Sequence, residues 1–201
     1  MNDHPQTRLV VLISGHGSNL QAILDACSQG TLNARVQAVF SNKTEAFGLE
    51  RARQAGVPAV AVPKPRDLDR RIYDAQLGER VAAYQPEWVV LAGWMRILSS
   101  EFLSRFAGKV VNLHPALPGM FAGTNAIERA YEAFQGGSIQ HTGVMVHLVP
   151  DEGVDSGPVL DQEIVAIYPG ETLSTLEERT HMVEHKLLVR VLQSLINRTG
   201  S

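Results

Sequence analysis

The sequence predicts one α/β domain with a mostly parallel sheet, helices on both faces, a C-terminal strand pair and a long C-terminal helix. Three observations favour this fold class. Short apolar runs alternate with segments of helical periodicity, as in a parallel sheet that is buried on both faces. From Gly143 onward, two apolar runs follow each other and only a polar, acidic loop joins them. The segment from Thr172 to Arg198 then repeats apolar residues at the spacing of one helix face.

The elements follow in order. Residues 8–14 are rich in Val, Leu and Ile and predict the first strand, which a glycine-rich turn connects to an amphipathic helix at 20–30. This strand and helix unit recurs. Further strands are predicted at 36–41, 59–62, 88–93 and 110–115, and the helices after them at 46–56, 67–84, 99–106 and 124–134. The strand pair is predicted at 143–149 and 158–167, and residues 63–67 read as an exposed loop. We expect a flexible N-terminus at 1–7, one domain at 8–198 and a short tail at 199–201.

The composition argues against several classes of function. The chain has 18 basic and 21 acidic residues, a net charge of −3, which is too balanced for a surface that captures nucleic acid. No apolar run is long enough to cross a membrane, so neither secretion nor membrane insertion is expected. The single cysteine, Cys27, fits a reducing compartment, and we expect a cytoplasmic protein. Metal binding is not expected, because no HxH, HExxH or CxxC spacing occurs.

A glycine-rich turn directly after the first strand is the first candidate site. Gly15-His16-Gly17-Ser18-Asn19 precedes a helix, whose free N–H groups could bind a phosphate. The alternative is a plain turn in which Ser18 or Asn19 caps the helix. The turn is not a dinucleotide-binding fingerprint, because Leu20 stands where the third glycine would be.

Two further candidates lie at later strand ends. Strand alternation places Asn112 and His114 on one face, where an amide donor and an imidazole can converge on one reacting oxygen; capping or core packing is the alternative. In the acidic loop from Pro150 to Pro158, Asp155 could orient and charge a histidine. The remaining polar residues of interest are interpreted as structural or solvated: Asp151, Glu152, His141 and His147.

Together these segments resemble the phosphoribosylglycinamide formyltransferase family across residues 8–198. The matching strings are VVLISGHGSNLQAI, FSNKTEAFGLERARQAG, VVLAGWMRILS, NLHPALPG and GVMVHLVPDEGVDSGPV. The resemblance implies a Rossmann-like formyltransferase fold with Asn112, His114 and Asp155 as the catalytic set. It implies transfer of a formyl group from 10-formyltetrahydrofolate to the amine of glycinamide ribonucleotide, in the synthesis of the purine nucleotide IMP. Asn112 and a protonated His114 would then stabilise the oxyanion, while Asp155 raises the imidazole pKa and relays protons through a water.

The same resemblance implies where the two ligands bind. The phosphate and ribose of the substrate are assigned to Gly17, Ser18, Asn19, His181 and Glu184. The folate cosubstrate is assigned to Arg70, Met95, Arg96, Ile97, Leu98, Pro150, Asp151, Glu152 and Val154, together with Asn112 and Asp155. We expect a monomer or homodimer that acts on small molecules and uses neither a metal nor nucleic acid.

Two positions depart from the family pattern. Asn125 stands where the family usually has a histidine, and Ala122 where members with a shorter loop often have an aspartate. We expect Asn125 to support the loop over His114 by hydrogen bonding. The alternatives are a non-catalytic or altered-specificity folate- or nucleotide-binding relative and other folate enzymes. Methionyl-tRNA formyltransferase should carry a further basic C-terminal domain, and formyltetrahydrofolate deformylase an N-terminal regulatory domain.

Overall fold

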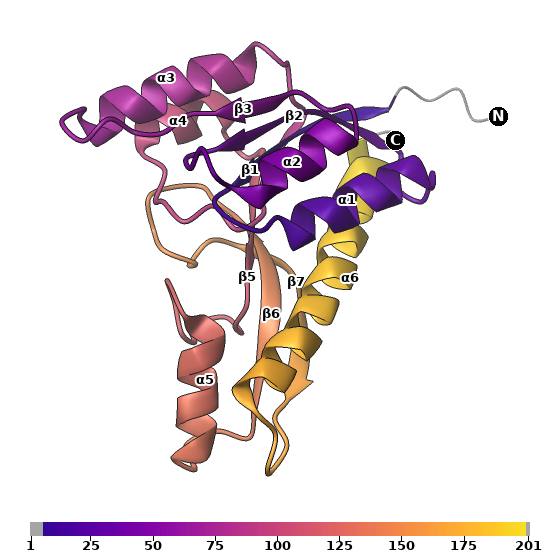
Figure 1. The fold of residues 1–201 in the computed structure, drawn as a ribbon, viewed down its shortest axis with the longest axis vertical. Coiled ribbons are helices and arrows are strands. Elements are labelled where there is room, and N and C mark those ends of the chain that lie inside the picture. The colour runs from indigo at the N-terminus through magenta and orange to yellow at the C-terminus, as the bar shows by residue number, and fades with distance from the viewer. Residues whose placement is uncertain (1–5, 200–201) are drawn as a thin grey trace.

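The computed structural model describes residues 6–199 and contains one mixed sheet (Figure 1). The strands are β1 (Thr7–Ile13), β2 (Ala34–Ser41), β3 (Ala59–Ala61), β4 (Trp88–Leu91), β5 (Val110–His114), β6 (His141–Leu148) and β7 (Val159–Ala166). The α-helices are α1 (Ser18–Ser28), α2 (Phe47–Gln54), α3 (Arg70–Ala82), α4 (Ser100–Leu103), α5 (Ala126–Gln135) and α6 (Leu173–Thr199). A 3₁₀ turn, η1 (Ser104–Phe106), extends α4.

The sheet confirms the predicted fold class. Its strand order is β3-β2-β1-β4-β5-β6-β7, so the order reverses between β1 and β4. Neighbouring strands from β1 to β5 are parallel, whereas β6 is antiparallel to β5 and β7 is antiparallel to β6. The last two strands are the predicted strand pair.

Helices cover both faces of the sheet, because alternate residues of each central strand point to opposite sides. Leu9, Val11 and Ile13 of β1 belong to a core that includes residues of α1, α2, α5 and α6. Val10 and Leu12 belong to a second core, with α3, α4 and η1. The long helix α6 runs along β6 and β7, as Figure 1 shows, and packs against α1.

The element boundaries differ from the predicted ones at a few places. Thr7 is the first residue of β1, and α6 continues to Thr199. The rest of the predicted flexible terminus and tail, residues 1–5 and 200–201, lies outside the described residues. Helix α3 begins later than predicted, because the Asp69 carboxylate accepts hydrogen bonds from the N–H groups of Arg71 and Ile72 and caps the helix there. None of the helices within residues 6–199 combines the length and apolar character needed to span a bilayer.

Candidate active site

The candidate catalytic residues lie at the carboxyl edge of the parallel strands. Ligands of open α/β sheets bind beyond this edge, where the strand order reverses, and here β1 and β4 flank the reversal. Leu91, the last residue of β4, pairs with Asn112, and β5 continues two residues further to His114. Asn112 and His114 therefore lie level with and beyond the end of β4.

The structure brings Asn112, His114 and Asp155 together. The Asn112 Nδ2 atom donates to Asp155 Oδ1 at 3.0 Å, and His114 Nδ1 lies 3.2 Å from Asp155 Oδ2. The backbone N–H of Gly123 donates to the same Oδ2 atom at 2.8 Å. Asp155 has a positive φ of 48°, so the loop turns sharply to direct its carboxylate at β5. Within one small volume, His114 and Asp155 can exchange protons and Asn112 can donate hydrogen bonds.

Opposing effects act on the pKa values of this cluster. Burial lowers the pKa of His114, and the charge of Asp155 and the Phe121 carbonyl only partly offset this, so the net pKa is below 6.5. Burial raises the pKa of Asp155, but the polar contacts around its carboxylate, the Gly123 N–H among them, outweigh burial and lower the net value. Asp155 is thus ionised at neutral pH. Asp155 raises the pKa of His114, as predicted, but burial has the larger effect, so the net pKa is lowered rather than raised.

A backbone carbonyl and an arginine hold the loop that follows β5. The Phe121 carbonyl lies 3.2 Å from His114 Nε2. Arg129 Nη2 donates to the carbonyls of both Phe121 and Ala122. Asn125 directly precedes α5 with a φ of 55°, is exposed, and makes no side-chain hydrogen bond within residues 6–199. The expectation that Asn125 supports this loop is therefore wrong, because Arg129 makes the contacts instead.

His147, which the sequence pattern predicted to be structural, lies within the candidate catalytic site. It is 1 % exposed and lies directly opposite Asn112 in the antiparallel pairing of β5 and β6. Its Nε2 atom is 3.1 Å from Asn112 Nδ2 and 3.6 Å from Asp155 Oδ1. The alternation of residues 143–149 could place His147 on one face, but finding its partner requires the register between the two strands.

The glycine-rich turn forms the N-terminal end of α1. Gly17 precedes the helix with a φ of 76°, and no side chain caps the helix. The alternative in which Ser18 or Asn19 is the cap is therefore wrong. A Cβ atom at Gly17 would lie 2.7 Å from the Gly48 Cα atom, so α1 and α2 approach each other too closely for a larger residue. The first N–H groups of α1 lack a side-chain acceptor, which suits an anion.

Helix α6 brings the predicted ribose-binding residues to this turn. Asn19 Nδ2 donates to Glu184 Oε2 at 2.9 Å, and His181 Nδ1 lies 3.2 Å from the same oxygen. Glu184 is only 4 % exposed, and its hydrogen bond raises the pKa of His181. The Oδ1 atom of Asn19 is buried without a hydrogen-bond partner. The structure thus joins Asn19, His181 and Glu184 from two ends of the chain.

Hydrogen bonds hold both ends of the predicted pterin-binding segment, residues 95–98. The Met95 N–H donates to Ser14 Oγ at 2.8 Å, and the Ser99 N–H donates to the buried Asp74 carboxylate at 2.7 Å. Between these anchors, Met95 and Ile97 expose apolar side chains and Leu98 is buried. The guanidinium of Arg96 stacks on the ring of Tyr73, with 5.3 Å between its central carbon and the ring centroid.

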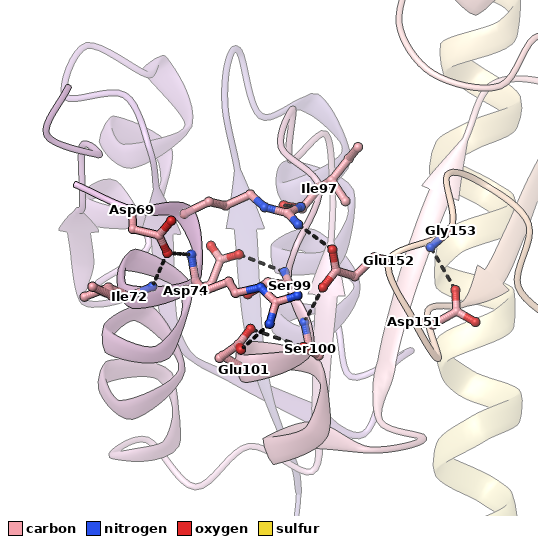
Figure 2. A network of polar contacts seen from close by, with 12 residues as sticks. Asp69, Ile72, Asp74, Ile97, Ser99, Ser100, Glu101, Asp151, Glu152 and Gly153 are labelled. Atoms are coloured by element: carbon pink, nitrogen blue, oxygen red, sulfur yellow. Dashed lines mark hydrogen bonds and ion pairs between the residues drawn. The ribbon is translucent and has the colours of Figure 1, made fainter. Parts of the chain in front are cut away.

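Figure 2 shows how the loop from Pro150 to Asp155 meets α3 and α4. Glu152 pairs with the guanidinium of Arg70 and accepts a hydrogen bond from the Ser100 N–H at 3.0 Å. These contacts lower the pKa of Glu152, the Ser100 hydrogen bond having the largest effect. Asp151 is exposed and, within residues 6–199, accepts a hydrogen bond only from the Gly153 N–H. The prediction that both acidic residues are merely solvated is therefore wrong for Glu152, which connects the loop to α3 and α4. The prediction holds for Asp151.

Fold and site together define an open α/β protein that gathers proton-transfer and hydrogen-bonding groups at the carboxyl edge of its sheet. The sequence matches the model of the formyl transferase family over residues 7–192, and the chain belongs to this family of enzymes. Within residues 6–199, no group of three His, Cys, Asp or Glu side chains is arranged to hold a metal ion.

Known relatives are similar over nearly the whole chain. Phosphoribosylglycinamide formyltransferase of Schizosaccharomyces pombe is 48 % identical over 201 aligned residues, which cover 94 % of this chain and 96 % of that protein. The Escherichia coli enzyme of the same name is 44 % identical and covers 92 % of this chain and 84 % of its own length. Among solved structures, glycinamide ribonucleotide transformylase 1 from Geobacillus kaustophilus superimposes with a TM-score of 0.87 at 42 % identity, over 94 % of this chain and 98 % of that one.

Proposed function

We propose that this enzyme transfers the formyl group of 10-formyltetrahydrofolate to the amine of glycinamide ribonucleotide, N1-(5-phospho-D-ribosyl)glycinamide, in de novo purine (IMP) synthesis. The observation that carries the proposal is the contact of Asn112, His114 and Asp155 at the carboxyl edge of the sheet. The names of the similar proteins support the choice of substrate. The proposal also places the enzyme in the cytoplasm, as a monomer or homodimer.

The chemistry needs groups that stabilise an oxyanion and groups that move one proton. The amine nitrogen attacks the formyl carbon, and the carbonyl oxygen becomes negatively charged. The Asn112 amide and the His114 imidazole donate hydrogen bonds to that oxygen. Although burial lowers the pKa of His114 in the free enzyme, the developing negative charge favours its protonated form. The reacting oxygen must replace the Phe121 carbonyl beside His114 Nε2.

Asp155 carries the proton in this scheme. Because its carboxylate is ionised, it can take a proton from the new ammonium group through a water and return it to N10 of the folate. The bond between the formyl carbon and N10 then breaks, which leaves formylated product and tetrahydrofolate. The sequence of steps requires neither a metal ion nor a covalent nucleophile.

The two ligands would bind at opposite ends of the site. The free N–H groups at the start of α1 would hold the substrate phosphate, with Gly17 and Ser18 in that turn, and Asn19, His181 and Glu184 would hold the ribose hydroxyls. The exposed apolar side chains of Met95, Ile97 and Val154 suit a flat pterin ring between two loops. Arg70 would meet the negatively charged folate tail.

An assay of the purified protein with both substrates tests this proposal. We expect formation of tetrahydrofolate that depends on glycinamide ribonucleotide and is absent without it. Turnover of 10-formyltetrahydrofolate with water alone would indicate a hydrolase instead. Tight binding of both ligands without transfer would contradict the proposal and favour a non-catalytic binding protein.

A further inference from the structure

The buried imidazole of His147 has one ring nitrogen whose protonation state the backbone determines. Its Nδ1 atom lies 2.8 Å from the carbonyl oxygen of Leu148. A carbonyl oxygen can only accept a hydrogen bond, so Nδ1 must carry a hydrogen. In the neutral imidazole, Nε2 then presents a lone pair, and it lies 3.1 Å from Asn112 Nδ2.

We propose that His147 is a positioning residue for the transfer reaction, because its Nε2 lone pair fixes which way the Asn112 amide faces. This inference rests on the proposed function. Asn112 Nδ2 carries two hydrogens, of which one is bound by His147 Nε2 and the other by Asp155 Oδ1. His147 retains its hydrogen during the reaction. The second hydrogen stays on Nδ2, and its hydrogen bond changes acceptor from Asp155 to the oxyanion.

The reversed amide would place two acceptors together. If the oxygen and nitrogen of Asn112 exchanged places, the amide oxygen would face the Asp155 carboxylate at 3.0 Å. An imidazolium at His147 could donate to that oxygen, because its Nε2 atom is 3.1 Å from this position, but the amide oxygen would still face the negatively charged carboxylate of Asp155. The observed distances therefore favour the neutral His147 and the amide whose nitrogen faces Asp155.

In this arrangement the Asn112 amide always presents its N–H group, a hydrogen-bond donor, to the reacting oxygen. An asparagine amide that is free to reverse would present its oxygen to the oxyanion part of the time, and two acceptors repel each other. His147 and Asn112 are directly paired across β5 and β6, so the strand register itself holds the two side chains together. His147 is only 1 % exposed, and water cannot easily replace its lone pair.

Three variants separate positioning from a merely structural role. His147→Leu removes the acceptor, and we expect kcat to fall about tenfold or more while the KM values of both substrates stay within about threefold. His147→Gln supplies a side-chain oxygen near the position of Nε2, and we expect it to restore kcat to within about threefold of the wild type. His141→Gln, an exposed histidine on the same strand, is the matched control and should leave both constants unchanged.

A spectrum of the wild-type enzyme tests the same inference without relying on the variants. The chain has 7 histidines, so a long-range ¹H–¹⁵N correlation of histidine-labelled protein resolves their tautomers, and His147→Gln identifies the signal of His147. We expect a protonated Nδ1 and an unprotonated Nε2. A protonated Nε2, or an active wild type whose kcat is unaffected by His147→Leu, would overturn the role of His147 alone. A wild type without formyl transfer would overturn the proposed function, and the role of His147 with it.

Discussion

At the scale of single residues, Asp155 connects every group of the candidate catalytic site. One carboxylate oxygen accepts from Asn112, and the other accepts from the Gly123 N–H and faces His114. Its charge therefore acts on the amide, the imidazole and the loop before α5 at once. A substitution that keeps its shape but removes its charge isolates the electrostatic contribution.

Asp155→Asn is expected to lower kcat by about a hundredfold or more, the scale of losing acid–base assistance. The KM values should change little, because the two side chains have nearly the same shape. Steady-state kinetics check this, with Asp67→Asn as the control, since Asp67 is exposed and is not assigned to either ligand. A variant with wild-type kcat would remove Asp155 from the mechanism.

Asn125→His introduces the residue that the family resemblance implies at this position. The side chain of Asn125 is exposed and makes no hydrogen bond within residues 6–199, so we expect kcat/KM to change by less than about tenfold, or about 1.4 kcal/mol. Arg129→Met should have the larger effect, because Arg129 holds the carbonyls of Phe121 and Ala122. Kinetics of both variants decide the order. A native protein that becomes active only after Asn125→His would contradict this prediction.

At the scale of elements, two helix contacts shape the substrate end of the site. Helix α6 carries Glu184 to Asn19 of α1, although 165 positions separate the two residues. Helices α1 and α2 meet at two glycines, Gly17 and Gly48. The first contact presents polar groups to a ligand, and the second determines where the N-terminal end of α1 lies.

Asn19→Ala and Glu184→Ala are expected to weaken binding of glycinamide ribonucleotide and to leave binding of the folate nearly unchanged. The reason is that both residues lie at the start of α1, whereas the proposed pterin segment follows β4. Titration calorimetry with each ligand separately measures this. Glu178→Ala, an exposed glutamate on the same helix, is the control. Weaker binding of the folate instead would reverse the assignment of the two ends.

Gly48→Ala is expected to lower the free energy of unfolding by about 1–3 kcal/mol, the usual cost of overpacking a core. A Cβ atom there would lie 2.3 Å from Ile13 Cδ1 and 3.2 Å from the Gly17 Cα atom. Gly15→Ala is the matched control, because its Cβ atom meets nothing within 4 Å. Urea unfolding of both variants checks the difference. Equal stability of the two variants would show that α2 can move away from β1 without cost.

At the scale of the whole molecule, three histidines with shifted pKa values link stability to pH. Burial lowers the pKa values of His114 and His185 below 6.5, whereas the hydrogen bond to Glu184 raises the pKa of His181. His114 and His185 have lowered pKa values in the folded state, so each binds a proton more readily in the unfolded chain. Their contribution to stability is therefore lost as the pH falls through 6.5. The contribution of His181 has the opposite sign: it is present below 6.5 and is lost as the pH rises through the raised pKa.

We therefore expect the free energy of unfolding to fall as the pH is lowered from about 7 to about 5, because two histidines with lowered pKa values oppose one histidine with a raised pKa. Burial raises the pKa of Asp74, and this carboxyl opposes the trend as it binds its proton. Asp155 does not contribute over this interval, since its lowered pKa affects stability only near and below 3.8. Urea unfolding at several pH values measures the trend. His185→Leu should reduce the acid sensitivity, and His141→Leu, at an exposed position, should not. Stability that rises on acidification would show that His181 dominates.

Local patterns in the sequence predicted much of this protein. Apolar runs and helical periodicity located all seven strands and the main helices, because burial on one or two faces is a property of each segment. The two-residue period of a strand placed Asn112 and His114 on one face. The resemblance to a known family added His181 and Glu184 and assigned roles to Asp155 and Asn19, which local patterns had already indicated, but it gave no distances among them.

Only the tertiary structure decided which groups touch. The register of β6 against β5 puts His147 opposite Asn112, and a sharp turn at Asp155 brings its carboxylate to both histidines. Arg129, rather than Asn125, forms the hydrogen bonds that hold the loop over His114. Arg70 forms an ion pair with Glu152 rather than facing solvent. The physical reason is that periodicity depends on neighbours along the chain. Strand register, loop direction and the net pKa of His114 depend on packing between segments that are distant in sequence.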